Sequence, residues 1–221
     1  VAMMINKKGI KIKKFWRTVL VMTIAIPQFV SLLYVSKLFD SSGIIGEALG
    51  KIPFIADFLK TNHYVNLWES PTIAKILLIV INIWIGIPHI MLMATGILMN
   101  IPQDLYESSR IDGATGFQQY TKITLPYMLF VTGPYLLTSF IGNMNNFNVI
   151  YLLTGGAPYT QSFAGAGKTD LLITWLYRLT VTNNDYKLAA VIGIMVFLVV
   201  AVISLVVYNY MPSIKSEEEF Q

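Results

Sequence analysis

Cysteine is absent from this chain of 221 residues, and only 13% of the residues are charged. Without cysteine there can be no disulfide, no thiolate nucleophile and no cysteine-ligated metal site. Histidine is scarce too, and His89 has only His63 as a companion, which argues against a histidine metal site. Soluble domains carry about a quarter of charged residues, so this shortage together with a mean hydropathy of +0.60 predicts an integral membrane protein.

Long apolar stretches in the sequence support the same prediction. A membrane-spanning helix takes about 20 mostly apolar residues, and four segments are long enough. They run over approximately residues 18–39, 72–99, 125–153 and 188–210. Pro27 is expected to bend the first span, and Pro71 suits the first turn of the second. The prediction is an all-α membrane domain over 18–210, with a flank at 1–17 and a tail at 211–221.

A basic cluster precedes the first predicted span. It consists of Lys7, Lys8, Lys11, Lys13, Lys14 and Arg17. Such clusters mark the cytoplasmic side of membrane helices. A nucleic-acid partner is not expected, because no folded binding module accompanies the cluster. Both termini are therefore predicted to be cytoplasmic, with loops 40–71 and 154–187 outside the cell and loop 100–124 inside.

Loop 100–124 has a recognisable pattern. A glutamate is followed by two small residues, a glycine four positions on and, after nine further residues, Ile-x-Leu-Pro. The acidic residues Asp104 and Glu107 favour the start of a short helix behind Pro102, and Gly113 favours a left-handed turn at its end. A second short helix is expected to begin near Thr115 or Gly116. The motif residues are Glu107, Ser108, Ser109, Asp112, Gly113, Ile123, Leu125 and Pro126.

Uncharged polar residues recur within two of the predicted spans. Asn82, Gly86 and His89 are spaced by four and seven residues, which places them on one helical face. Ser139, Gly142, Asn143 and Asn146 have a similar spacing in the third span. Two such faces could line a cavity for a neutral ligand rich in hydroxyl groups, because asparagine both donates and accepts hydrogen bonds. On the chemistry of these residues alone, polar contacts that hold helices together in a bilayer are favoured over such a cavity.

The loop pattern resembles the signature loop of bacterial ABC-importer permeases. From about Phe15 to Tyr210 the chain is similar to the C-terminal part of the larger membrane subunit of maltose/maltodextrin importers. The likeness is carried by Asn82–Pro88, Ile101–Ala114, Phe117–Pro126, Asn145–Pro158 and Thr169–Arg178. Members of that family have further spans upstream, so this chain, which opens with Val1, is expected to be either truncated or unusually short.

The resemblance implies a role and a set of partners. The signature loop would dock on a cytoplasmic ATPase dimer, which binds the ATP, while this chain needs no cofactor and performs no chemistry. A second permease subunit, membrane lipid and an extracellular solute-binding protein would complete the system. The implied saccharide contacts are Asn82, Ile85, Gly86, His89, Ser139, Gly142, Asn143 and Asn146. His89 and Gly142 stand where the best-known relative has aromatic residues, which leaves the identity of the saccharide open.

Two other interpretations are weighed. The chain could be an ABC permease for another sugar, a polyol or glycerol phosphate, although a phosphorylated solute calls for buried basic residues that the spans lack. It could also be a truncated, non-transporting membrane protein. The segment Gly165–Thr169 looks like the end of a phosphate-binding loop, but Ser162 stands where that motif needs its first glycine, so a flexible external loop is expected instead.

Overall fold

The computed structural model describes residues 13–159 and 164–210. The predicted tail and most of the basic flank, including Lys7, Lys8 and Lys11, lie outside the described residues. Regular structure within those two ranges is helical, apart from a single antiparallel bridge between Tyr159 and Gly167. The all-α prediction is confirmed.

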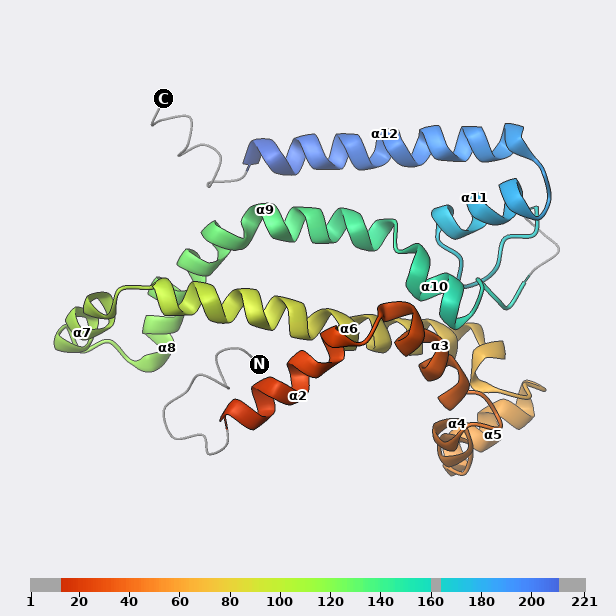
Figure 1. Cartoon of the computed structure of the whole chain (residues 1–221), viewed down its shortest axis with the longest axis horizontal. Coiled ribbons are helices and arrows are strands. Elements are labelled where there is room, and N and C mark those ends of the chain that lie inside the picture. Colours follow the sequence, from red (N-terminus) through yellow and green to blue (C-terminus); the bar gives the residue numbers. More distant parts are fainter. Residues whose placement is uncertain (1–12, 160–163, 211–221) are drawn as a thin grey trace. The chain divides into compact units, whose positions relative to one another are not determined.

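The described elements alternate between long apolar helices and short connecting ones (Figure 1). In chain order they are α2 (Lys13–Ala25), α3 (Gln28–Leu38), α4 (Ile44–Gly50), α5 (Pro53–Thr61), η1 (Leu67–Glu69), α6 (Pro71–Asn100), α7 (Gln103–Ile111), α8 (Gly116–Gln119), η2 (Tyr120–Thr124), α9 (Leu125–Met144), α10 (Phe147–Leu153), α11 (Leu172–Val181) and α12 (Tyr186–Tyr210).

Three stretches of the described chain are long and apolar enough to cross a membrane: α6, Gly116–Leu153 and α12. They correspond to the second, third and fourth predicted spans. The first predicted span is interrupted, because α2 ends at Ala25 and Pro27 forms the N-terminal boundary of α3. The bend expected at Pro27 is thus a break between helices of 13 and 11 residues. Proline causes it by removing a backbone donor and clashing with the preceding turn.

The chain divides into two compact units. Unit 1 comprises Val1–Ile24, Gly86–Ile141 and Val200–Gln221, and unit 2 comprises Ala25–Ile85 and Gly142–Val199. The long helices α6, α9 and α12 each run from one unit into the other. Unit 1 contains the predicted signature loop, and unit 2 contains the two loops predicted to be external.

Unit 2 has a hydrophobic core where α3, α6 and α10 pack together. Its buried members are Leu32, Trp68, Ala74, Leu78, Ile81, Val149, Ile150 and Leu153. Two polar contacts tie the helix ends to this core: the Trp68 indole donates to the Ser36 carbonyl at 3.2 Å, and the Ser36 hydroxyl donates to the Leu153 carbonyl at 2.9 Å. The core therefore holds α10 against α3 and the first half of α6.

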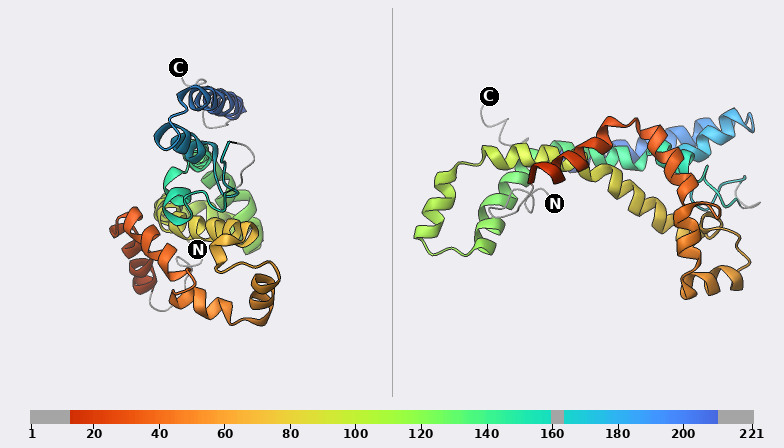
Figure 2. Two further views of the ribbon diagram at one scale, coloured as in Figure 1. Left: turned by 90° about the vertical axis from the view of Figure 1, so that its right-hand side faces the viewer. Right: turned by 60° about the horizontal axis from the view of Figure 1, so that its bottom comes forward.

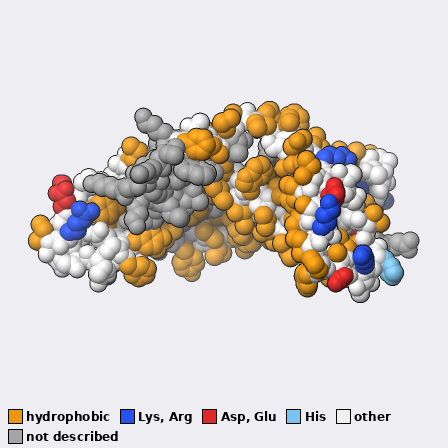
Figure 3. Space-filling view, turned by 90° about the horizontal axis from the view of Figure 1, so that it is seen from below, with side chains coloured by type: hydrophobic (Ala, Val, Ile, Leu, Met, Phe, Trp, Pro, Cys, Tyr) orange, Lys and Arg blue, Asp and Glu red, His pale blue; other side chains and the backbone are white. Residues whose placement is uncertain are grey.

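Apolar side chains cover much of the described part of the face seen in Figure 3, and the charged ones in this view lie toward its two ends. On α12, Phe197 is 69% exposed and Leu205 is 63% exposed. Large apolar areas of this kind mark contact with a membrane or with other proteins. The exposed apolar helices are those expected of a protein that lies in a membrane.

Candidate functional site

Three asparagines meet in unit 2. The Asn82 amide on α6 donates to the Asn143 side-chain oxygen on α9 at 2.7 Å. The Asn146 amide donates to the Asn82 side-chain oxygen at 2.8 Å. Asn82 therefore uses both its donor and its acceptor groups across helices. The structure brings together three of the residues that the sequence proposed for a saccharide site.

A helix break lies at this cluster. The spacing argument placed Asn146 on the same continuous helix as Ser139 and Asn143, and that expectation is wrong. Helix α9 ends at Met144. Asn146 caps the start of α10, because its side-chain oxygen accepts from the backbone amide of Val149 at 3.3 Å. Asparagine is a preferred helix cap because its short side chain satisfies a free backbone donor. The two helix ends still leave Asn146 within reach of Asn82.

The other predicted contacts are distributed over the two units. In unit 2, Ile85 packs partly buried against the hydrophobic core, and a side chain at Gly142 would enter open space. In unit 1, a side chain at Gly86 would also meet open space, and the His89 ring lies 5.7 Å from the Tyr135 ring. Ser139 is half-buried on α9. The structure does not test the sugar-binding roles, which stay predictions.

An aromatic cluster follows the asparagines along the chain. Phe147 and Tyr151 of α10 stack with centroids 4.8 Å apart, and both meet the Tyr177 ring of α11 edge-on. The Tyr151 hydroxyl, as a hydrogen-bond partner, raises the pKa of Tyr177. This cluster was not predicted, although the spacing of four residues between Phe147 and Tyr151 places them on one helical face.

The second candidate site is the signature loop of unit 1. Gly113 has φ +78°, and the amides around it close the end of α7: Gly113 donates to the Arg110 carbonyl at 3.1 Å and Ala114 to the Ser109 carbonyl at 2.9 Å. This is a Schellman turn, which a residue with a β-carbon adopts only with strain. The left-handed turn predicted at Gly113 is confirmed.

A capping box starts the second short helix. The Thr115 hydroxyl accepts from the backbone amide of Gln118, and the side-chain oxygen of Gln118 accepts from the backbone amide of Thr115 at 2.7 Å. Helix α8 therefore begins at Gly116, as the sequence predicts. Pro102 differs slightly from expectation, because it precedes the first turn of α7 rather than lying in it. Together α7, α8 and η2 form a hairpin (Figure 2), which we call the coupling hairpin (residues 103–124).

Side chains that the sequence analysis did not select clasp this hairpin. The Tyr106 and Thr124 hydroxyls are 2.8 Å apart. The side-chain amide of Gln119 donates to the Tyr106 carbonyl at 3.2 Å and to the Ser109 hydroxyl at 2.8 Å. Thr124 is buried. Ser109, one of the two small motif residues, thus accepts the bond that joins α7 to α8.

The predicted motif residues differ in their exposure. Glu107, Ser108, Asp112, Gly113 and Pro126 are exposed, whereas Ser109, Ile123 and Leu125 are half-buried. Two apolar side chains project from the tip of the hairpin: Ile111 is 86% exposed and Phe117 is 75% exposed. An exposed face that combines acidic and apolar groups is able to dock on another protein.

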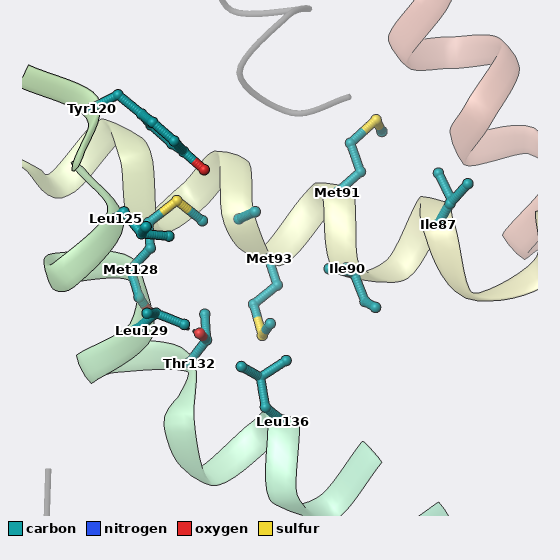
Figure 4. Close-up of a pocket in the computed structure, with 11 residues that line it drawn as sticks. Ile87, Ile90, Met91, Met93, Tyr120, Leu125, Met128, Leu129, Thr132 and Leu136 are labelled. Atoms are coloured by element: carbon teal, nitrogen blue, oxygen red, sulfur yellow. Dashed lines mark hydrogen bonds between the residues drawn. The ribbon is translucent and has the colours of Figure 1, made fainter. Parts of the chain in front are cut away.

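A cavity of about 430 Å³ lies in unit 1 between α6 and the start of α9 (Figure 4). Its lining is almost entirely apolar, and consists of Ile87, Ile90, Met91, Met93, Ala94, Tyr120, Leu125, Met128, Leu129, Thr132 and Leu136. The Thr132 hydroxyl is already used, since it donates to the Met128 carbonyl at 2.7 Å. A site for a hydroxyl-rich ligand needs several convergent polar groups, so this cavity is a poorer sugar site than the asparagine cluster.

Comparison with known proteins identifies relatives of the whole described region. The family model described as "Binding-protein-dependent transport system inner membrane component" matches residues 1–215. The chain is 36% identical over 98% of its length to the galactooligosaccharides transport system permease protein GanP of Bacillus subtilis, covering 50% of that protein. It is also 36% identical, over 93% of its length, to the maltose/maltodextrin transport system permease protein MalF of Escherichia coli, covering 39% of it.

A solved structure has a similar fold. The crystal structure of a bacterial alginate ABC transporter in complex with an alginate pentasaccharide-bound periplasmic protein contains a chain that matches with a TM-score of 0.73 and 25% identity. The match covers 96% of this chain and 70% of that one. The chain spans half or less of the length of the two permease relatives.

Proposed function

The chain belongs to the family of binding-protein-dependent transport system inner membrane components, and from this we propose that it forms the translocating part of an ATP-driven oligosaccharide importer. The substrates proposed are maltose and malto-oligosaccharides. This family places the chain in the cell membrane as a multi-pass protein, and its relatives are named as transport permeases rather than as enzymes.

The asparagine cluster at the break between α9 and α10 is the observation that carries the proposal. Non-helical backbone within a membrane is tolerated only where it is buried in protein or lines a water-filled cavity. Here the break falls inside the apolar stretch Gly116–Leu153, and Asn82 faces it from α6. A polar cluster at an unwound segment is the arrangement that a translocation pathway needs.

Saccharide hydroxyls would replace the bonds that the asparagines make with one another. Asn82, Asn143 and Asn146 offer amide donors and carbonyl acceptors, which match hydroxyl groups of either role. A side chain at Gly142 in unit 2 would meet open space, which leaves room for a ligand beside the cluster. We expect the cluster to open when sugar arrives and to re-form after its release.

The coupling hairpin would transmit the closure of the ATPase dimer to the membrane helices. Its exposed face, with Glu107, Ile111 and Phe117, is proposed to dock in the cytoplasmic ATPase dimer, with both termini of this chain on the same side of the membrane. Closure of the dimer would move the hairpin as one body, because Tyr106, Gln119 and Thr124 hold its arms together. The movement would then pass into α6 and α9, which flank the hairpin in sequence.

The proposed partners follow from the family and from the solved relative. A substrate-binding protein would deliver sugar from outside, as the family description implies, and the alginate transporter was solved with its own periplasmic protein bound. A second permease subunit and lipid would cover the exposed apolar helices. The alternative with support is a permease for another oligosaccharide, since one relative is a galactooligosaccharide permease.

Vesicle transport tests this proposal. The full reading frame that encodes this chain would be co-expressed with its neighbouring transporter genes, and the assembled complex reconstituted with the binding protein and internal ATP. We expect uptake of labelled maltotriose that unlabelled maltose inhibits more strongly than galactooligosaccharides. Stronger inhibition by galactooligosaccharides would assign the alternative substrate. A properly assembled complex that imports no oligosaccharide would refute the proposal.

A further inference from the structure

Arg178 of α11 contacts four residues of a loop in unit 2. Its two terminal nitrogens contact the two Asp170 carboxylate oxygens at 2.8 and 3.0 Å, and they also donate to the Gly165 carbonyl at 2.9 Å and the Gly155 carbonyl at 2.7 Å. The guanidinium carbon lies 4.4 Å from the centre of the Tyr159 ring. We call Gly155–Tyr159 and Ala164–Asp170 the clasped loop.

The Asp170 carboxylate is itself enclosed. Its side chain is 4% exposed and that of Arg178 is 17% exposed. Asp170 also accepts from the Gly167 amide at 2.7 Å and from the Thr174 hydroxyl at 2.9 Å. A buried pair is stable only when such additional bonds compensate for the lost hydration of both charges. Removing one partner would therefore leave a buried charge and release the loop.

Two glycines of this loop, Gly156 and Gly167, are explained by the same packing, whereas a side chain at Gly165 would meet open space. A side chain at Gly156, which has φ +90°, would collide with Asp170 and Arg178, and one at Gly167 would collide with the Gly156 carbonyl. The Thr169 hydroxyl adds a bond to the Ala157 carbonyl at 2.6 Å. Close backbone packing therefore accounts for Gly167 within the segment that looks like a phosphate-binding loop. The expected flexible loop is, in its described part, held by side chains.

This rigid loop still presents groups to its surroundings. Tyr159 is 58% exposed, with the guanidinium near its ring, and Lys168 is exposed. A preformed surface binds with a smaller loss of conformational entropy than a mobile one, so rigidity acts on affinity.

We propose that Arg178 and Asp170 are positioning residues, which preform the clasped loop as a docking surface for the substrate-binding protein. This inference rests on the proposed function, which places loop 154–187 outside the cell and supplies the partner. The pair acts through the loop and does not touch the sugar. Its loss is expected to weaken docking of the binding protein while leaving the maximal rate of the transporter unchanged.

Hydrogen–deuterium exchange of the assembled transporter tests the first half of this inference. Arg178→Lys keeps the charge but loses the two-pronged contact with Asp170. Amides of Gly167, Lys168 and Thr169 are expected to exchange at least about tenfold faster in this variant, with α12 unchanged. The control Lys187→Ala removes an exposed charge from α12 and should leave these amides as in the wild type. Unchanged exchange in Arg178→Lys would overturn the inference.

Titration of ATPase activity with the binding protein tests the second half. For Arg178→Lys and for the charge-removing Asp170→Asn, the half-saturating concentration of binding protein should rise about tenfold at an unchanged maximal rate. A fall in maximal rate at unchanged half-saturation would overturn the inference and assign the pair to general stability. If the wild-type complex does not respond to the binding protein, the proposed function fails as well. A responsive wild type with unaffected variants refutes the inference alone.

Discussion

Asn82 is the residue on which the proposed sugar site depends most. It makes two hydrogen bonds across helices, to Asn143 and from Asn146. Such bonds within membranes contribute about 0.6 kcal/mol each, so the cluster adds roughly 1 kcal/mol to helix packing. That modest value separates the two interpretations of the polar residues, because a packing role and a binding role predict effects of different size.

Replacing Asn82 by leucine tests them against each other. Asn82→Leu should lower the melting temperature by only about 2–4 °C, since roughly 1 kcal/mol is lost. The half-saturating sugar concentration for uptake should rise at least about tenfold, because two polar groups of the site disappear. The control Asn100→Leu, at the exposed end of the same helix, should change neither quantity appreciably. A lower melting temperature with unchanged sugar dependence would reassign the cluster to helix packing.

Gly113 gives a second prediction at this scale. A side chain there would meet open space, so the penalty of Gly113→Val is the left-handed backbone alone, about 1–2 kcal/mol. We expect uptake to fall about tenfold while the complex still assembles and binds sugar. Gly113→Asn is the matched control, since asparagine tolerates this conformation, and it should retain most of the uptake. Equal activity of the valine and asparagine variants would contradict the assigned turn.

At the scale of elements, the coupling hairpin was the most predictable part. Gly113 and Thr115 are local signals, and their roles depend on neighbours a few residues away, so sequence alone located both helix boundaries. The clasp by Tyr106 and Gln119 was not predictable, because it joins residues 10 to 18 positions apart through a turn whose geometry the pattern does not specify. The same holds for Arg178, whose partner Asp170 and carbonyl contacts depend on loop packing.

The break between α9 and α10 shows a different limit. Asn145 and Asn146 interrupt the apolar sequence only briefly, so the average hydropathy of a window of about 20 residues still predicts one span over 125–153 and hides the interruption. Pro27, by contrast, predicts a helix break from the sequence alone, because proline lacks the backbone N–H that a continuous helix needs. Asn146 caps α10 through its side-chain oxygen, and its side-chain amide also donates to Asn82 on α6, a contact that no sequence pattern specifies.

The clasp of the coupling hairpin makes a testable prediction. Tyr106→Phe removes the contact with Thr124, which is worth about 1 kcal/mol, without changing the ring. The hairpin should then transmit ATPase closure less faithfully, and sugar transported per ATP should fall about fivefold. Tyr127→Phe, which removes a hydroxyl from α9, serves as the control. An unchanged ratio in Tyr106→Phe would show that the hairpin moves as one body without this bond.

For the whole molecule, the orientation in the membrane can be mapped directly, because the chain has no cysteine. Single substitutions Ser42→Cys and Thr182→Cys fall in the loops predicted to be external, and Gln103→Cys falls in the coupling hairpin; all three positions are exposed. A membrane-impermeant maleimide should label the first two in intact cells and the third only after permeabilisation. Labelling of Gln103→Cys in intact cells would invert the proposed topology.

The most direct test of the central claim is simultaneous measurement of sugar uptake and ATP hydrolysis in vesicles that contain the assembled transporter. The wild type should couple the two in the presence of binding protein and maltotriose. Asn82→Leu should reach the uptake of the wild type only at higher sugar concentration, whereas Gly113→Val should continue to bind sugar but show uptake about tenfold lower at every concentration. If both variants import maltotriose as the wild type does, neither the asparagine cluster nor the coupling hairpin has the role proposed for it.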